Sequence, residues 1–385
     1  MTMGKVVIRP CGEYTEDCCR AALLAALEPL GGLDWVREGM KIAVKANLIT
    51  ALKPEAAATT HPALLAALVR LLTEKGAEVR VGDSPGGVFN KAYVDRVYAV
   101  CGLEAVKEAG GSLNEDYSVG ECYDPECRVL KSFSYTAWLD WADVILSFSK
   151  LKVHAMMSMT AATKNLFGCI PGSIKAEYHY RFPEYRDFAD MLVDLNVHFK
   201  PLLHFCDAVT GMEGNGPTQG IPRHVGTLLV SPDPFALDLA AAKLIGLTKE
   251  DVPYLEAAFA RGFIPAEAAA LEVDGNLEAF LTPDFRHVTG TRDLTALIGG
   301  DSSLRRLLRS VLQRMLRTYP ELEKAACVGC GVCARSCPAA AIEIKEKKAR
   351  IDRSKCIRCF CCQELCPKGA MKVHRPLGAR IAGKL

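Results

Sequence analysis

IAVKA at 42–46, PALLAALVRLLTEK at 62–75 and EVRVG at 78–82 together predict the fold class. The first and third pieces are short and rich in β-branched residues, as buried strands are, whereas the middle piece carries an apolar stripe at helical spacing. A strand, a helix and a second strand in this order are typical of a parallel sheet with helices on its faces. We therefore predict an α/β fold, with a mainly parallel sheet and helices on both faces.

The same alternation extends outward from this stretch, from residue 5 to about residue 247. Further strands are expected at Val6–Ile8, Val144–Ser147, Leu202–Cys206 and Thr227–Val230. Further helices are expected at Thr15–Leu30, Tyr93–Cys101, Ala161–Phe167 and Pro234–Ile245.

The length of 385 residues and the apolar content of 50% predict two or three folded domains rather than a disordered chain. No apolar run approaches the ~18 residues that a membrane span needs, so we expect no membrane span. The N-terminal residues lack the basic and apolar regions of a secretory signal, and we expect a cytoplasmic protein. No nucleic-acid partner is expected.

Nine of the 17 cysteines fall within residues 327–366 and form a duplicated motif. Three cysteines two residues apart are followed, after three more residues, by a Cys-Pro pair, a spacing that suits two [4Fe–4S] clusters whose fourth ligands are exchanged. One cluster is expected on Cys327, Cys330, Cys333 and Cys366, and the other on Cys356, Cys359, Cys362 and Cys337. A pair of zinc sites is the alternative. Cys361 does not fit the repeat, and the C-x4-C pair Cys122 and Cys127 is a weak metal signal.

This region resembles a bacterial-type dicluster ferredoxin over about sixty residues. The resemblance implies that Ala341–Ile344 and Met371–Val373 are strands that pair within a pseudo-twofold module. It also implies electron transfer as the role of this module.

Charge divides the chain in the same place. Residues 321–385 hold 14 Lys or Arg and 6 Asp or Glu, whereas the first 300 residues hold 28 and 38. Such a basic module attracts acidic partners, and we expect an acidic ferredoxin or similar protein as electron donor. The expected domains are an α/β domain at 1–297, an amphipathic connector helix at 298–320, a ferredoxin-like domain at 321–376 and a basic tail at 377–385.

Polar side chains gather just after several expected strands. The carboxyl ends of parallel strands border the ligand crevice of an open α/β sheet, so these segments are expected to converge. Several lysines at one site would be costly without a compensating anion, which predicts an anionic small-molecule substrate. The candidate catalytic residues are Lys45, Asp83, Lys152, His154 and Lys164. The candidate substrate-binding residues are Asn47, His61, Ser84, Lys150, Asn165, Asp207, Glu213 and Asn215.

These stretches resemble the family known as domain of unknown function 362, over roughly residues 5–290. The segments that carry the resemblance are Lys45–Asn47, Gly82–Pro85, Lys150–His154, Thr160–Gly168, Asp207 and Gly211–Pro217. Ala46 stands where the family pattern leads us to expect proline. Members of this family are often fused to a dicluster ferredoxin, but the resemblance implies no defined reaction.

The hypothesis that joins these features is an iron–sulfur oxidoreductase. Electrons would pass from the C-terminal clusters to an anionic substrate at the strand ends, with His154 or Asp83 as the proton source. Two alternatives stay open: a non-catalytic protein for electron transfer or cluster delivery, and a redox sensor that binds a ligand without turnover.

Overall fold

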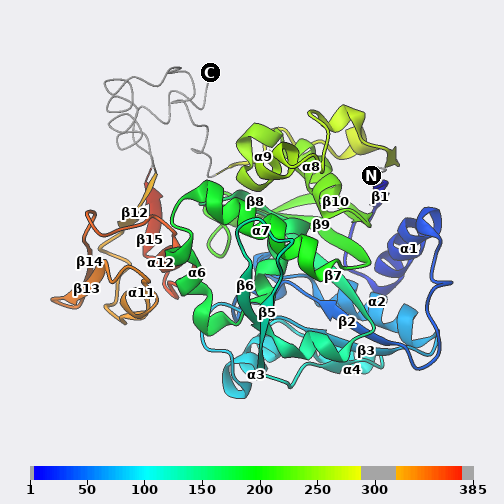
Figure 1. Cartoon of the computed structure of the whole chain (residues 1–385), viewed down its shortest axis with the longest axis horizontal. Helices are drawn as coiled ribbons and strands as arrows, with labels where there is room; N and C mark the ends of the chain where they lie inside the picture. Colours follow the sequence, from blue (N-terminus) through cyan, green and yellow to red (C-terminus); the bar gives the residue numbers. More distant parts are fainter. Residues whose placement is uncertain (1–3, 288–317, 375–385) are drawn as a thin grey trace.

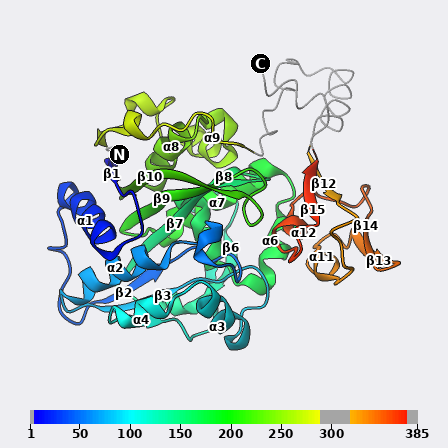
Figure 2. The same ribbon diagram turned by 180° about the vertical axis from the view of Figure 1, so that it is seen from behind.

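The computed structural model describes residues 4–287 and 318–374. The predicted connector helix falls almost wholly outside these residues, and so does the basic tail. The described residues form a large α/β domain, and the smaller cysteine-rich domain lies at one side of it, next to helix α6 (Lys175–Arg181) (Figures 1 and 2).

One mixed sheet organises the large domain. Its strands are, in spatial order, β11 (Val273–Asp274), β1 (Val6–Pro10), β10 (Ile221–Ser231), β9 (Leu203–Glu213), β7 (Val144–His154), β2 (Lys41–Lys45), β3 (Glu78–Gly82) and β4 (Ser112–Leu113). The neighbours from β9 to β4 run parallel, whereas β10 is antiparallel to both β9 and β1. The predicted mainly parallel sheet is thus confirmed.

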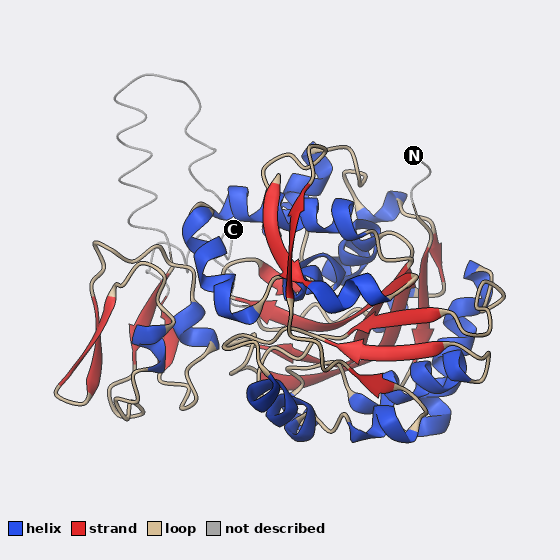
Figure 3. Ribbon diagram, turned by 60° about the horizontal axis from the view of Figure 1, so that its bottom comes forward, coloured by secondary structure: helices blue, strands red, loops and turns tan. Residues whose placement is uncertain are grey.

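Helices cover both faces of this sheet, as Figure 3 shows. Alternate residues of a strand point to opposite faces, so Val7 belongs to one core and Val6 and Ile8 to the other. The first core is closed by α1 (Glu16–Leu27), α2 (Pro62–Thr73), α3 (Lys91–Val100) and α4 (Glu104–Glu108). The second is closed by α5 (Ala162–Asn165), α7 (Tyr185–Phe199), α8 (Pro234–Leu244) and α9 (Pro253–Ala260).

Several elements differ in length from the sequence prediction. β7 continues past Ser147 to His154. This extension still pairs with β9 as far as Lys152, and its last three residues also pair with β8 (Ser158–Thr160), which turns back antiparallel to it. The helix expected over 161–167 is one turn of α-helix followed by a 3-10 turn. A small hairpin of β5 (Val119–Tyr123) and β6 (Ser132–Thr136) stands apart from the sheet.

The C-terminal domain consists of two similar halves. Its elements are β12 (Tyr319–Leu322), α11 (Val332–Arg335), β13 (Ile342–Lys345), β14 (Lys348–Ile351), α12 (Cys361–Glu364) and β15 (Met371–His374). The expected strands exist, but they do not pair with each other: β13 pairs with β14, and β15 pairs with β12. β13 pairs with the next strand along the chain, and β15 pairs with the first strand of the domain. The spacing of the cysteines carries no information about this pairing.

Candidate functional site

Lys45 lies at the carboxyl end of β2, buried to 1% exposure. Parallel pairing sets it beside Gly82 of β3, so that Asp83 follows at the same edge. Its Nζ is 2.8 Å from Asp83 Oδ1 and donates to Asn165 Oδ1 (2.9 Å) and to the Ala46 carbonyl. Asp83 accepts in turn from the Leu48 and Ser84 amides. The Lys45 charge is therefore balanced inside the protein.

Gly168 permits this close packing. A β-carbon at this position would collide with both Asp83 Oδ1 and Lys45 Nζ. The glycine in the quoted Thr160–Gly168 segment thus lets the chain cross directly over the buried ion pair.

Lys152 is also 1% exposed, but it has no carboxylate partner among the described residues. Its Nζ donates to Asn47 Oδ1 (2.7 Å) and to the Ala58 carbonyl (2.6 Å), both of which are neutral. Burial lowers the pKa of Lys152 well below its usual value, and the charge of Lys164 lowers it further. Lys152 is therefore a group that gives up its proton more readily than an ordinary lysine.

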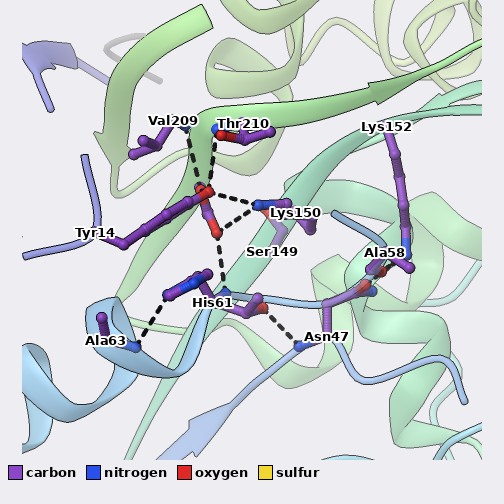
Figure 4. A network of polar contacts seen from close by, with 12 residues as sticks. Tyr14, Asn47, Ala58, His61, Ala63, Ser149, Lys150, Lys152, Val209 and Thr210 are labelled. Carbon is purple, nitrogen blue, oxygen red and sulfur yellow. Dashed lines mark hydrogen bonds and ion pairs between the residues drawn. The ribbon is translucent and has the colours of Figure 1, made fainter. Parts of the chain in front are cut away.

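Lys150 has other partners than Lys152, and Figure 4 shows the contacts of both lysines. Lys150 Nζ donates to Tyr14 Oη and Asp207 Oδ2, both at 2.8 Å, and Asp207 also accepts from Tyr14 Oη and the His61 amide. The His61 ring stacks on Tyr14, and burial lowers its pKa to about 4. A register shift in the pairing of β7 with β9, between Lys150 and Lys152, directs the two lysines into different surroundings.

His154, at the end of β7, connects the two domains. Its Nδ1 accepts from the amides of Met156 and Met157 at 3.1 Å, and its Nε2 lies 2.8 Å from Glu364 Oε1 of the C-terminal domain. Burial lowers the pKa of His154 to about 4, with a further contribution from the charge of Lys164. In this structure His154 therefore forms a contact between the two domains.

Of two further candidates, Glu213 is the last residue of β9, and Asn215 lies in the loop that follows. Glu213 accepts from Arg286 Nε at 2.6 Å, which fixes it in an ion pair on the large domain. The Asn215 carbonyl accepts from the side chain of Gln363 at 3.0 Å. The structure therefore does not bring these two side chains to the lysines.

A cavity of about 970 Å³ lies between the two domains. It is bounded by the strand ends of the large domain and by α11, α12 and the segment around Cys366 of the small one. Seven of the predicted site residues line it: Lys45, Asn47, Asp83, Ser84, Lys152, Lys164 and Asn165. His61, Lys150, His154, Asp207, Glu213 and Asn215 are not part of this lining. Seven of the thirteen predicted residues thus line the cavity, and the other six lie outside its lining.

Several residues that line the cavity are not marked by the strand-end pattern of the sequence, among them Thr160, Phe167, Lys175, His179, Gln219 and Glu364. Lys175 and His179 lie on α6, a short helix outside the strand-end pattern, so no periodic signal marked them. Lys175 donates to the Ser84 carbonyl, and burial lowers its pKa to about 7. Thr160 and Phe167 lie within the Thr160–Gly168 segment of the family resemblance, but both are uncharged, so the search for charged residues at strand ends does not include them.

The duplicated cysteine motif forms two further, smaller cavities. Cys327, Cys330, Cys333 and Cys366 line one, and Cys337, Cys356, Cys359 and Cys362 line the other. These are the two predicted ligand sets, including the exchange of the fourth cysteine. The Ala341 amide donates to Cys337 Sγ and the Ala370 amide donates to Cys366 Sγ, both at 3.2 Å. Amide donors to cysteine sulfur are typical of iron–sulfur sites, so the donor set fits two [4Fe–4S] clusters.

Cys361 lies at the boundary of two of these cavities. It is buried, and it lines both the second cysteine cavity and the large cavity between the domains. Cys122, by contrast, is near His198 of α7, with Sγ 3.6 Å from Nε2, far along the chain from the cluster motif.

None of the helices in the described ranges is both long and apolar enough to cross a bilayer.

Comparison with known proteins agrees with this division of the chain. Residues 319–367 match the 4Fe-4S dicluster domain, and residues 42–243 match the family described as Domain of unknown function (DUF362). A thylakoid-associated protein of Synechocystis sp. is 35% identical over 263 residues, which are 66% of this chain and 78% of the relative.

A solved structure of the lactate racemase apoprotein from Thermoanaerobacterium thermosaccharolyticum aligns with 57% of this chain at 11% identity and a TM-score of 0.35. The chain spans about half of that structure, 54% of its length, and this likeness is too weak to bear on function. The two sequence matches and the two cysteine cavities lead to one conclusion: the chain belongs to the DUF362 family and carries a dicluster domain for two [4Fe–4S] clusters.

Proposed function

We propose that this protein is an iron–sulfur oxidoreductase that reduces an anionic small molecule in the cavity between its two domains. The observation that carries the proposal is the position of Cys366. This predicted cluster ligand lines its own cysteine cavity and also the large cavity, where the lysines of the α/β domain form the opposite wall. A cluster site and a cationic ligand site therefore share one boundary.

The clusters, when bound, supply electrons one at a time. A two-electron reduction of a carbonyl or an activated carbon–carbon double bond consumes two electrons and two protons. The two electrons would come from two molecules of a reduced, acidic ferredoxin, each giving one. The protons would come from the cavity wall and, through it, from solvent.

The anion is bound by the lysines that have no carboxylate partner within the described parts of the chain. Lys45 is paired with Asp83 and Lys150 with Asp207, so both act on the substrate only through the residues that they hold in place. Lys164 is different: no hydrogen bond or ion pair holds its ammonium group within residues 4–287 and 318–374. Asn47 and Asn165 hold the lysine network together and face the same cavity.

Lys152 is the best-placed proton donor. Its ammonium group lines the cavity between two neutral oxygens, and its lowered pKa favours release of a proton to a reduced substrate. Both oxygens of Asp83 are already engaged, and His154 does not line the cavity. We therefore assign His154 a positioning role.

A cytoplasmic location and an acidic ferredoxin partner are part of the same proposal.

The test measures how fast the reduced clusters are re-oxidised. The holoprotein is reduced anaerobically, excess reductant is removed, and re-oxidation is followed by absorbance after addition of the anionic small-molecule fraction of a cell extract. We expect accelerated re-oxidation in the wild type and in the surface control Lys107→Ala, and none in Lys164→Ala. Lys107 is an exposed residue paired with Glu104, so its removal leaves the cavity intact. A non-catalytic electron carrier would show no acceleration by this fraction, and equal rates in all three proteins would contradict the proposal.

A further inference from the structure

Besides Lys45 and Lys152, four cationic residues line the cavity, and they fall into two groups. The inner group is Lys164 and Lys175, whose Nζ atoms lie 5.7 Å and 5.8 Å from the centroid of the same ring, Phe167. The outer group is Arg96 on α3 and Arg335 on α11, both exposed and contributed by different domains. The two groups line one continuous cavity.

Acidic groups in the lining do not balance these charges. Of the described residues that line the cavity, two are carboxylates and six are Lys or Arg; Asp83 pairs with Lys45, and Glu364 contacts His154 and also attracts Lys164. Lys175 donates only to a neutral carbonyl, and so does Arg335, from Nη1 to the Cys330 carbonyl at 3.3 Å. In the described ranges no ion pair engages Lys164, Lys175, Arg96 or Arg335. Cations gathered in a partly buried cavity repel each other, and an anionic ligand relieves this cost.

Two buried polar side chains of the same wall also lack partners. Thr160 Oγ1 and His179 Nδ1 have no hydrogen-bond partner within the part of the chain that the structure describes, although the two residues are only 2% and 4% exposed. Buried polar atoms are normally paired, so unpaired ones that line a cavity indicate that a ligand or water completes them. This observation is independent of the charge count.

We infer that the cavity binds an extended polyanion, with at least two carboxylate or phosphate groups. One acidic group occupies the inner position between Lys164 and Lys175, and another occupies the outer position at Arg96 and Arg335. A small monoanion would satisfy only one of these groups, and it would leave most of a cavity at the upper end of the ~300–1,000 Å³ range of ligand pockets unfilled. This inference deepens the proposed function, because it names the class of compound that the same cavity takes.

The ligand also connects the two domains. The inner lysines and Arg96 belong to the α/β domain, whereas Arg335 belongs to the ferredoxin-like domain. A polyanion that reaches Arg335 is in contact with the helix that follows Cys330 and contains Cys333, two ligands of the first cluster. Substrate binding therefore depends on both domains being in place.

Calorimetric titration of the oxidised holoprotein tests this inference without any turnover. Inorganic phosphate, pyrophosphate and triphosphate form one series, and acetate, succinate and citrate form the other. We expect affinity to rise by about tenfold or more from the first to the last member of at least one series, since a charge-assisted contact contributes ~1.5–3 kcal/mol. The series with the larger rise distinguishes a phosphate ligand from a carboxylate ligand.

Variants assign the two positions. Lys164→Ala and Lys175→Ala should weaken every anion by about tenfold, whereas Arg96→Ala and Arg335→Ala should remove the gain of the polyanion and leave phosphate or acetate unchanged. Lys107→Ala is the matched surface control, and iron content verifies that each variant is folded and loaded. Equal affinity for mono- and polyanions, or equal weakening by Lys107→Ala, would overturn the inference. Polyanion binding without cluster re-oxidation would support this inference and contradict the proposed function.

Discussion

Gln219 of the large domain and Gln363 of the small domain each donate hydrogen bonds to main-chain carbonyls of the other domain. Gln219 Nε2 donates to the Gln363 carbonyl at 2.5 Å, and Gln363 Nε2 donates back to the carbonyls of Asn215 and Gly216. The Thr218 hydroxyl adds a bond to the Glu364 carbonyl. Gln363 is fully buried, so the loop between β9 and β10 is the surface on which α12 packs. Together with the contact between His154 and Glu364, this packing joins the two domains on either side of the cavity.

Replacing Gln219 by Ala should loosen this contact. The variant loses its bonds to the Gln363 carbonyl and to Asn215 Nδ2, and a typical hydrogen bond stabilises by ~0.5–1.5 kcal/mol. We expect amide hydrogen exchange in α12 and in residues 214–220 to accelerate about 2- to 10-fold, with unchanged exchange in β2 and β3. Unchanged exchange in α12 would show that the domains are held by other contacts.

Cys361 and Cys362 are adjacent, and the structure predicts opposite outcomes for them. Cys362→Ser removes one of the four predicted ligands that line the second cysteine cavity, whereas Cys361→Ser removes its fifth thiol and leaves both predicted ligand sets complete. We expect about eight iron and eight sulfide per chain in the wild type and in Cys361→Ser, and about half of that in Cys362→Ser. The measurement is iron and acid-labile sulfide analysis after anaerobic purification. Loss of four iron in Cys361→Ser would mean that Cys361 is a ligand, and zinc in the wild type would contradict the cluster assignment.

The sequence predicted the sheet and the domain for two clusters because these depend on local patterns. Strands and helices of the large domain follow their apolar periodicity, and the cluster ligands follow a fixed spacing. The site was predicted only in part. Lys45 and Lys150 are similar in sequence context, and only the three-dimensional structure shows that Asp83 and Asp207 neutralise them.

The other half of the cavity could not be predicted from strand ends at all. Lys175 and His179 come from a short helix, and Glu364 and Cys366 come from the second domain. Their convergence depends on how α12 docks on the large domain. This tertiary contact consists of main-chain carbonyls, the side chains of Gln219, Gln363 and Thr218, and the contact between His154 and Glu364. Main-chain carbonyls leave no trace in a sequence pattern.

Anion binding should weaken as the pH rises through about 7. Lys175 has its pKa lowered to about 7 by burial, raised in part by Asp83 and Cys169 and lowered further by Lys45 and Lys164. Below this pH the group is charged and attracts an anion, and above it the group is neutral, so affinity falls by up to about tenfold per pH unit. Sulfate is a suitable probe, because its charge is constant in this range.

Lys175→Arg is the control for this titration, because a guanidinium group stays charged. We expect a flat affinity for sulfate from pH 6 to pH 9 in this variant, measured by calorimetry beside the wild type. Two parallel profiles would assign the pH dependence to another group.

Electron delivery by an acidic ferredoxin should depend steeply on salt. The basic C-terminal module carries 14 Lys or Arg against 6 Asp or Glu, and complementary charge acts mainly on the encounter rate. Raising the salt from ~0.01 M to ~0.3 M shortens the Debye length from ~30 Å to well below ~10 Å, so the second-order rate in stopped-flow reduction should fall.

Charge reversal at Lys345 and Lys347, both exposed, should lower the low-salt rate. Lys348 is unsuitable for this purpose, because its Nζ donates to the Cys327 carbonyl at 2.6 Å and so supports the cluster loop. A rate that is independent of salt and of these reversals would show that the basic surface serves the chain's own acidic domain instead.

Electron–nuclear double resonance of the reduced holoprotein with bound pyrophosphate tests the central claim most directly. The claim is that the anion site and the cluster site that shares Cys366 adjoin each other. We predict a phosphorus coupling to the electron spin of the reduced protein, present in the wild type and in Lys107→Ala and lost in the Lys164→Ala/Lys175→Ala double variant. Pyrophosphate that binds by calorimetry but gives no phosphorus coupling, or a coupling that persists in the double variant, would contradict the account.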